Sequence, residues 1–403
     1  MKKKLFILFI LIIFIMTITI KTNIKADGNI EIEKYIEKYI NIKKNIAIGD
    51  DHTLVIRNDN TLWAIGDNYY GQLGTGDNKN RGKFVKVLED VVFVAAQDFG
   101  SLAIKKDGTL WVTGDNFNGK LGTGDTKDIN IWTKVLDDVI YIEVTHYDGN
   151  FAIKNDGTLW TTKHFNKEYT NKWTKVMDNV KFVKDDYIIK QDGTLLDFID
   201  DKWTKVLDDV VYVTRKDSGR GWSWTLAIRK DGTLWEYIYD PYIKNNNNTS
   251  ANPNINKWIK VLDNVKYVST SGLHSLAIKN DGTLWATGEN KCGALGLGEK
   301  INYSVNWIKV MNNVEYVATA SSEDRTYSIA MKKDGTLWQA GFDKMMERDD
   351  SGIFGIDTKD IGKIVIGGIG EEPEKYFCIF NWIKVLDNVI YVPDFAYAIK
   401  KDA

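Results

Sequence analysis

The sequence predicts an all-β protein, a seven-bladed β-propeller of four-stranded antiparallel blades, and three observations lead to this prediction. The 403-residue chain has 14 Trp, 19 Tyr and 33 Gly but only 4 Pro, a composition that favours short strands and tight turns. A motif typified by Leu-Ala-Ile-Lys-Asn-Asp-Gly-Thr-Leu-Trp recurs along the chain, and a second motif, typified by Trp-Thr-Lys-Val-Leu-Asp-Asp-Val, follows each copy. Seven copies of each motif imply seven blades.

The first motif predicts a β-hairpin in every repeat. Its clearest copies are SLAIKKDGTLWVTG at 101–114 and SLAIKNDGTLWATG at 275–288. An alternating strand meets Asp-Gly, which favours a tight turn with positive φ, and Thr-Leu-Trp continues as the return strand. Successive copies are 48, 49, 36, 39, 50 and 53 residues apart, counted at Trp63, Trp111, Trp160, Leu196, Trp235, Trp285 and Trp338.

The second motif supplies two more strands, joined at its Asp-Asp or Asp-Asn pair. Its seven copies occupy 83–91, 132–139, 173–180, 203–210, 258–265, 307–314 and 382–389. A unit of four short strands cannot bury both of its faces alone, so the units must stack. The units show no 3.6-residue periodicity, which excludes leucine-rich and helical repeats.

The N-terminal part of the chain differs from the repeats. Three lysines precede an uncharged apolar run at 5–20, so residues 1–26 are interpreted as a secretory signal peptide, with an uncleaved membrane anchor as the alternative. Residues 27–43 form an N-terminal amphipathic segment, and residues 44–403 form the propeller. Removal of residues 1–26 removes five lysines and no acid, which changes the formal net charge from −2 to −7. An acidic mature chain has no general attraction to nucleic acid.

The Gly-rich connection between the two motifs carries a family resemblance. Gly66 is followed by Asp-Asn-Tyr-Tyr-Gly-Gln-Leu-Gly-Thr-Gly at 67–76, and similar segments occur at 114–124 and within 274–299. Together with the His-Ser-Leu-Ala strand, these segments resemble the repeat of the regulator of chromosome condensation family. The resemblance covers residues 44–403 and implies a seven-bladed propeller.

The repeats depart from that pattern in three places. The third and fourth copies lack the Gly-rich segment, the fifth replaces it with an Asn-rich stretch at 244–250, and the seventh carries an insertion near 343–380. Strand sequences that open a repeat occur at both ends of the chain, at 46–48 and at 389–392 and 397–400. We therefore expect one terminus to complete a blade that the other begins, which would hide an edge strand.

Twelve of the 14 tryptophans recur at fixed positions of the repeat, so we interpret them as packing between blades. Trp222 and Trp224 differ, because they lie with Arg220 in an extended connection, Asp-Ser-Gly-Arg-Gly-Trp-Ser-Trp, at 217–224. Aromatic and arginine side chains on loops commonly anchor protein or sugar recognition. Arg220, Trp222 and Trp224 are therefore the candidate partner-binding residues, although Trp224 aligns with His274 and has packing as its alternative.

No catalytic residues, metal ligands or cofactor are predicted. The Asp-Gly pairs are explained by turn chemistry, and the four histidines are scattered singly. His52 and His274 begin equivalent strands and are interpreted as structural hydrogen-bonding residues. The sequence leaves open whether Cys292 and Cys378 pair.

These observations favour a secreted or cell-surface, monomeric, non-catalytic protein, from an AT-rich bacterial genome by its composition. Its propeller loops would hold a protein partner or, as a weaker option, a cell-wall glycan. The resemblance also implies a guanine-nucleotide-exchange-like effector delivered to a host as an alternative. A glycan-acting enzyme would need converging carboxylates, for which Glu371, Glu372 and Glu374 are candidates. A structural spacer in a surface layer is a third option.

Overall fold

The computed structural model describes the chain from residue 45 onward, apart from several connections. The described residues are 45–49, 51–97, 99–145, 149–163, 171–184, 186–217, 223–239, 257–322, 325–342, 363–366, 378–386, 389–391 and 397–400. The predicted signal peptide at 1–26 and amphipathic segment at 27–43 lie outside these residues. Within the described part, no helix is long and apolar enough to cross a membrane.

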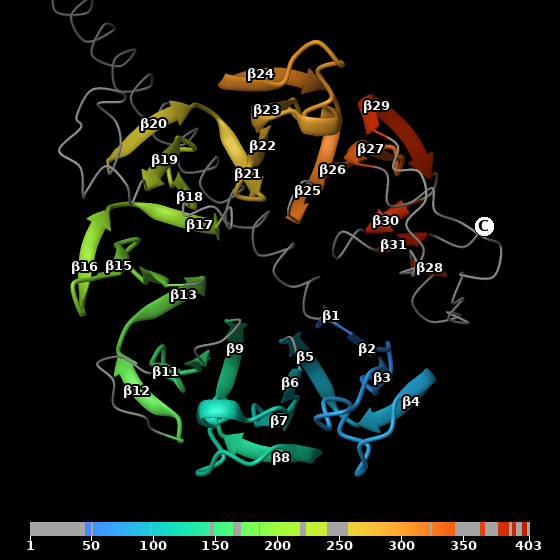
Figure 1. The fold of residues 1–403 in the computed structure, drawn as a ribbon. Helices are drawn as coiled ribbons and strands as arrows, with labels where there is room; N and C mark the ends of the chain where they lie inside the picture. Colours follow the sequence, from blue (N-terminus) through green and yellow to red (C-terminus); the bar gives the residue numbers. More distant parts are fainter. Residues whose placement is uncertain are drawn as a thin grey trace, which may run out of the picture.

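Seven four-stranded antiparallel sheets follow one another around a ring, as predicted (Figure 1). Blade 1 consists of β1 (Ile46–Ile48), β2 (His52–Ile56), β3 (Leu62–Gly66) and β4 (Arg81–Leu88). Blade 2 consists of β5 (Val91–Ala96), β6 (Gly100–Lys105), β7 (Leu110–Gly114) and β8 (Ile129–Leu136). Blade 3 consists of β9 (Val139–Val144), β10 (Asn150–Lys154), β11 (Leu159–Thr161) and β12 (Thr174–Met177). Blades 4 and 5 are β13 (Val180–Lys184), β14 (Tyr187–Lys190), β15 (Leu195–Ile199) and β16 (Lys202–Leu207); and β17 (Val210–Asp217), β18 (Ser223–Arg229), β19 (Leu234–Tyr239) and β20 (Trp258–Leu262). Blades 6 and 7 are β21 (Val265–Thr270), β22 (His274–Lys279), β23 (Leu284–Glu289) and β24 (Tyr303–Met311); and β25 (Val314–Ser322), β26 (Arg325–Lys332), β27 (Leu337–Phe342) and β29 (Cys378–Leu386).

An eighth, three-stranded sheet was not foreseen. It consists of β28 (Lys363–Ile366), β31 (Tyr397–Lys400) and β30 (Val389–Tyr391) and lies between blades 7 and 1 in Figure 1. The expectation that one terminus completes the other's blade was therefore wrong for the described strands. β1 pairs with β2 of its own repeat, whereas β30 and β31 are joined by β28, which the insertion of the seventh repeat supplies.

The two ends of each blade differ in their connections, which gives the ring two faces. On the first face, the Asp-Gly hairpin of one blade lies beside the Asp turn that leads to the next blade, and the Val139 amide donates to the Gly108 carbonyl. We call this the turn face. The opposite end carries the connections between the first and second strands and between the third and fourth strands, and there the Asp115 amide donates to the Phe99 carbonyl. We call this the loop face.

The hydrophobic core lies between blades rather than inside any one of them. Leu54 and Leu62 of blade 1 pack with Val91, Val94 and Trp132 of blade 2. The second-motif tryptophans pack at these junctions, as predicted. The first-motif tryptophans are half-buried, and three of them contact a junction core, namely Trp111, Trp160 and Trp338.

The innermost strands add an aromatic girdle that the sequence reasoning did not identify. Rings on blades 2 to 7 contact one another in succession, with centroid separations of 5.6–6.1 Å. The six residues are Phe93, Tyr141, Phe182, Tyr212, Tyr267 and Tyr316. Such tilted and edge-to-face pairs contribute beyond their buried area, so the girdle ties successive blades together around the centre.

Candidate functional site

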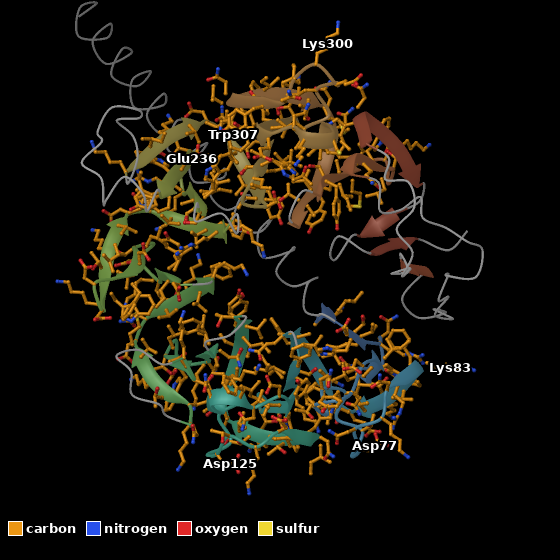
Figure 2. The ribbon with its side chains drawn as sticks, in the orientation of Figure 1. Asp77, Lys83, Asp125, Glu236, Lys300 and Trp307 are labelled. Carbon is orange, nitrogen blue, oxygen red and sulfur yellow. The ribbon has the colours of Figure 1, made fainter. Side chains whose placement is uncertain are left out.

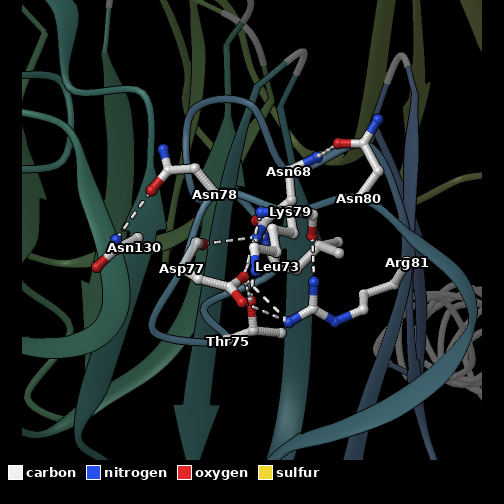
Figure 3. A network of polar contacts seen from close by, with 9 residues as sticks. All are labelled: Asn68, Leu73, Thr75, Asp77, Asn78, Lys79, Asn80, Arg81 and Asn130. Atoms are coloured by element: carbon white, nitrogen blue, oxygen red, sulfur yellow. Dashed lines mark hydrogen bonds and ion pairs between the residues drawn. The ribbon is translucent and has the colours of Figure 1, made fainter.

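The Gly-rich loop of blade 1, residues 66–76, is organised by one buried asparagine. Asn68 Oδ1 accepts a hydrogen bond from the Leu73 amide at 2.9 Å, and its Nδ2 donates to Thr75 Oγ1 at 3.0 Å and to the Asp77 carbonyl at 2.7 Å (Figure 3). The loops of blades 2 and 6 repeat the arrangement around Asn116 and Asn290. One asparagine side chain therefore links several groups of each loop through hydrogen bonds.

Charged and amide groups fasten the same loop to its surroundings. Arg81 forms an ion pair with Asp77 at 2.9 Å, and this contact, with hydrogen bonds from the Lys79 amide and Thr75, lowers the Asp77 pKa to about 2. Asn78 donates to the Tyr69 carbonyl at 2.7 Å. It also accepts from Asn130 of blade 2 at 2.9 Å (Figure 3). The loop is therefore fixed to the next blade as well as to its own.

Glycine is required where each loop meets the next blade. Gly74 has φ +68°, and a Cβ there would overlap the Trp132 indole. Gly122 has φ +74° and would overlap the Trp173 indole in the same way. Trp173 Nε1 in turn donates to the Leu121 carbonyl at 3.3 Å. The motif Gly-x-Leu-Gly thus encodes a close backbone approach to a tryptophan rather than a phosphate-binding loop.

Two buried histidines hold the loop face together between blades. His52 Nε2 contacts Ser101 Oγ at 2.8 Å, and Ser101 donates to the Gln72 carbonyl at 2.7 Å. His274 makes the same contact with Ser328, which donates to the Ala294 carbonyl. Burial lowers the pKa of His52 to about 4 and of His274 to about 3, so both are neutral at pH 7. Their predicted role as structural hydrogen-bonding residues is confirmed.

The loops present aromatic side chains to solvent at equivalent positions. Tyr69 in blade 1 is 70% exposed, and Phe117, which begins the 3₁₀ turn η1 (Phe117–Gly119), is 68% exposed. Ile131, beside Gly76 on the neighbouring strand, is also exposed. Aromatic side chains held by ordered backbone lose little conformational freedom when a partner covers them. The sequence reasoning quoted both aromatics within the family motif but did not weigh them as site residues.

The loop of blade 6 has a different character. Its 3₁₀ turn η2 (Lys291–Gly293) places Lys291 where blades 1 and 2 have Tyr69 and Phe117. Cys292 in this turn is disulfide-bonded, and the chain's one other cysteine is Cys378 at the start of β29. Cys292 therefore takes part in a disulfide bond, a point that the sequence left open.

Of the three partner-binding residues that the sequence suggested, the structure describes Trp224 alone. Arg220 and Trp222 lie outside the described residues, so their predicted role stays a prediction. Trp224 is half-buried in β18, and its ring would lie 3.1 Å from a Cβ built on Gly288 of blade 6. It therefore contacts the neighbouring blade, which is the packing alternative. The Glu371, Glu372 and Glu374 carboxyls of the enzyme alternative lie outside the described residues.

Chemistry of other kinds finds little support in the part of the chain that the structure describes. No group of three or more His, Cys, Asp or Glu side chains there is arranged to hold a metal ion. The site consists of internally hydrogen-bonded loops, two of which carry an exposed aromatic side chain, on a repetitive scaffold. The fold and site together define a repeat β-propeller that presents hydrogen-bonded loops with exposed aromatics on one face.

Sequence comparison identifies the repeat. Residues 44–72 and 265–294 match the Regulator of chromosome condensation (RCC1) repeat, which confirms the predicted resemblance for these two repeats. No curated protein sequence matches it.

The chain is also similar to several solved structures. Prp20p from Saccharomyces cerevisiae is 16% identical over 71% of this chain and 81% of that chain, with a TM-score of 0.48. Yeast RCC1 (Prp20) in a structure with Kap60 is 18% identical over 74% and 70%, with a TM-score of 0.46. Human WBSCR16 is 18% identical over 68% of each chain, with a TM-score of 0.42.

Proposed function

We propose that this protein is a non-catalytic binding scaffold that holds a protein partner on its loop face. The observation that carries the proposal is the pair of exposed aromatics, Tyr69 and Phe117, on equivalent and internally hydrogen-bonded loops of adjacent blades. Exposed aromatic side chains on ordered backbone are typical anchors of protein interfaces. Arg220 and Trp222 lie in the sequence between β17 and β18, whose described ends, Asp217 and Ser223, are at the same face.

The proposed location is extracellular or at the cell surface. The apolar run preceded by lysines at 1–26 supports export. Fractionation of the producing cell tests this part separately. Release of a protein that begins near Asp27 would support it, and retention of the intact chain in the cytoplasm would contradict it.

The binding proposal is tested by pull-down from extracellular material, followed by affinity measurement with the identified partner. We expect the double variant Tyr69→Ala and Phe117→Ala to weaken binding at least tenfold. Truncation of an anchor aromatic typically costs more than about 1.4 kcal/mol of binding free energy, which corresponds to a tenfold loss of affinity. Arg220→Ala and Trp222→Ala should weaken it as well. The matched control is Ile140→Ala, which removes a 53% exposed apolar side chain from the turn-face end of β9. Equal binding by the aromatic double variant and the control would contradict the proposal.

An exchange-factor role remains the alternative that the RCC1-like fold suggests. It predicts that the protein accelerates nucleotide release from a GTPase, whereas a scaffold leaves that rate unchanged. A nucleotide-release assay on any GTPase recovered in the pull-down distinguishes the two.

A further inference from the structure

Three aromatic rings form a row across the junction of blades 1 and 2 on the loop face. Tyr69 and Tyr70 belong to the Gly-rich loop of blade 1, which extends to the outer rim where Figure 2 labels Asp77. Phe99 belongs to the connection between β5 and β6 of blade 2. The Tyr70 ring centroid lies 5.0 Å from that of Tyr69 and 5.0 Å from that of Phe99. Among the described residues Tyr69 and Phe99 make no ring contact with each other, so Tyr70 is the middle ring.

All three rings of this row remain accessible to solvent. Tyr69 is 70% exposed, and Tyr70 and Phe99 are half-buried. The Tyr69 ring is inclined by 79° to that of Tyr70, and the Tyr70 ring by 39° to that of Phe99, so the rings present both faces and edges to a ligand. Neither tyrosine hydroxyl is hydrogen-bonded to any residue that the structure describes, so both can donate to a ligand.

The backbone that carries the row is held by hydrogen bonds. The Tyr70 amide donates to Gln72 Oε1 at 3.0 Å, and the Tyr69 carbonyl accepts from Asn78 at 2.7 Å. The Phe99 carbonyl accepts from the loop of blade 2 at 2.9 Å. A ligand that covers these rings therefore has less of the chain to order, which lowers the entropic cost of binding.

The loop of blade 1 also carries a carboxylate that no described cation neutralises. In the loop of blade 2, Lys120 forms an ion pair with Asp115 at 2.5 Å. Gln72 and Asp67 occupy the equivalent positions of blade 1, and the neutral Gln72 amide donates to Asp67 at 3.2 Å. Because Gln72 also accepts from the Tyr70 amide, the negative charge of Asp67 lies beside the middle of the row.

A polyproline II segment has the dimensions and the chemistry to bind this row. It turns once every three residues, which is roughly 9 Å along its axis, so prolines three positions apart lie on the same side. The centroids of Tyr69 and Phe99 are separated by at most twice the 5.0 Å step, so two such prolines can contact the two outer rings. The segment has no internal hydrogen bonds, and its carbonyls can therefore accept from the tyrosine hydroxyls. Aromatic-lined surfaces are the usual receptors of such segments.

The segment must come from another protein rather than from a second copy of this chain. The chain has only four prolines, and no two of them are three positions apart. They are Pro241, Pro253, Pro373 and Pro393.

We propose that Tyr69, Tyr70 and Phe99 bind a proline-rich segment of the protein partner in the polyproline II conformation. A lysine or arginine next to the prolines pairs with Asp67. The inference rests on the proposed function, because it assigns a chemistry to that protein partner.

The test measures the affinity of the full-length protein for three fluorescently labelled peptides. The first is Lys-Pro-Pro-Ser-Pro-Pro-Ser-Pro-Pro, the second has alanine in place of every proline, and the third has glutamate in place of the lysine. Fluorescence anisotropy gives the dissociation constants. We expect the first peptide to bind at least tenfold more tightly than the alanine peptide. It should bind three- to tenfold more tightly than the glutamate peptide, with a smaller difference in 1 M salt because salt screens exposed charges.

Variants of the protein identify the contacts. Tyr69→Ala and Phe99→Ala should each weaken binding of the first peptide at least fivefold, whereas Tyr69→Phe, which keeps the ring, should lose less than threefold. Asp67→Asn should remove the preference for lysine over glutamate. The matched control is Ile140→Ala, an exposed apolar residue of the turn-face end of β9, which should bind like the native protein. Circular dichroism and thermal unfolding establish that each variant is folded.

Three results would overturn the inference: no binding of the first peptide, equal binding of the proline and alanine peptides, or native affinity in both Tyr69→Ala and Phe99→Ala. The proposed function fails on a different measurement. If the native protein prefers the proline peptide but the double variant Tyr69→Ala and Phe117→Ala retains the recovered partner, the proposed function is contradicted. If that double variant loses the partner while proline and alanine peptides bind equally, the proline-rich segment alone is contradicted.

Discussion

The tryptophan hairpins of the turn face and the histidine contacts of the loop face are stabilised over very different sequence distances. On the turn face, Asp281 accepts hydrogen bonds from the amide and hydroxyl of Thr283, and Thr283 Oγ1 accepts from Trp285 Nε1 at 2.9 Å. Six hairpins repeat this arrangement, and a Lys or Arg side chain lies over each tryptophan ring. On the loop face, the contact of His274 with Ser328 joins residues 54 positions apart.

This difference explains why one face repeats and the other varies. A turn-face module needs only five neighbouring residues, from Asp281 to Trp285, so every repeat can retain it independently. A loop-face contact needs complementary residues on two blades. When the loop of one blade changes, the residue that it contacted on the next blade is no longer constrained and can be substituted too. Divergence therefore concentrates on the loop face, where we propose that a partner binds.

The largest effect is expected from crowding a loop against the next blade. Gly122→Ala should destabilise the protein by about 3 kcal/mol or more, because it combines a positive φ with overlap of the Trp173 indole. Gly124→Ala is the matched control, since it also has positive φ but its nearest neighbour is Lys172 Cε at 3.6 Å; its cost should be about 1–2 kcal/mol. Urea unfolding measures both, and equal losses would show that close approach is not what fixes the loop.

Acid should affect the loop face before the turn face. Because the folded-state pKa values of His52 and His274 are lowered, the unfolded chain binds more protons than the folded chain below pH 6.5. Stability should fall from pH 6.5 towards pH 4 by up to about 1.4 kcal/mol per pH unit for each histidine. Urea midpoints measured across this range test the prediction.

The turn face provides the internal comparison for that titration. Hydrogen bonds from threonine lower the pKa of turn aspartates such as Asp281, so their contribution is lost only as pH falls below about 3.8. His274→Gln should flatten the upper part of the profile and leave the lower part unchanged. A profile with no slope above pH 4.5 would mean that the histidines are not buried as neutral groups.

The smallest effect is expected from a single turn-face module. Asp281→Ala removes the acceptor for two hydrogen bonds of Thr283, yet the site is exposed, so the loss should be about 0.5–1 kcal/mol. Asp281→Asn keeps an acceptor oxygen and should lose less. Thermal unfolding compares the stabilities of the two variants. A loss of stability above about 2 kcal/mol for Asp281→Ala would show that the hairpin depends on contacts beyond its own five residues.

Sequence reasoning recovered the repeat because its determinants are local. Asp-Gly turns, alternating strands and the paired motifs identify seven four-stranded units without any knowledge of contacts between them. The aromatic girdle escaped notice because Phe93, Tyr141 and their counterparts occur one per repeat and contact only across blades. The eighth sheet escaped because β28 lies in an insertion with no counterpart in other repeats.

The candidate site was harder to foresee for the same reason. Trp224 stood out because it breaks the repeat pattern, but its contact with Gly288 depends on a partner 64 positions later. Tyr69 and Phe117 follow the pattern, and only their exposure distinguishes them from the buried aromatics.

The separate pairing of the terminal strands has an evolutionary consequence. Each of the seven four-stranded sheets is assembled from strands of one contiguous stretch, and no described sheet combines β1–β4 with β30 and β31. Duplication or deletion of a whole unit would therefore leave the ladders within the remaining sheets intact and would change only the side-chain contacts and turn hydrogen bonds between neighbouring blades. The gene for such a ring can change its number of blades by simple recombination between repeats.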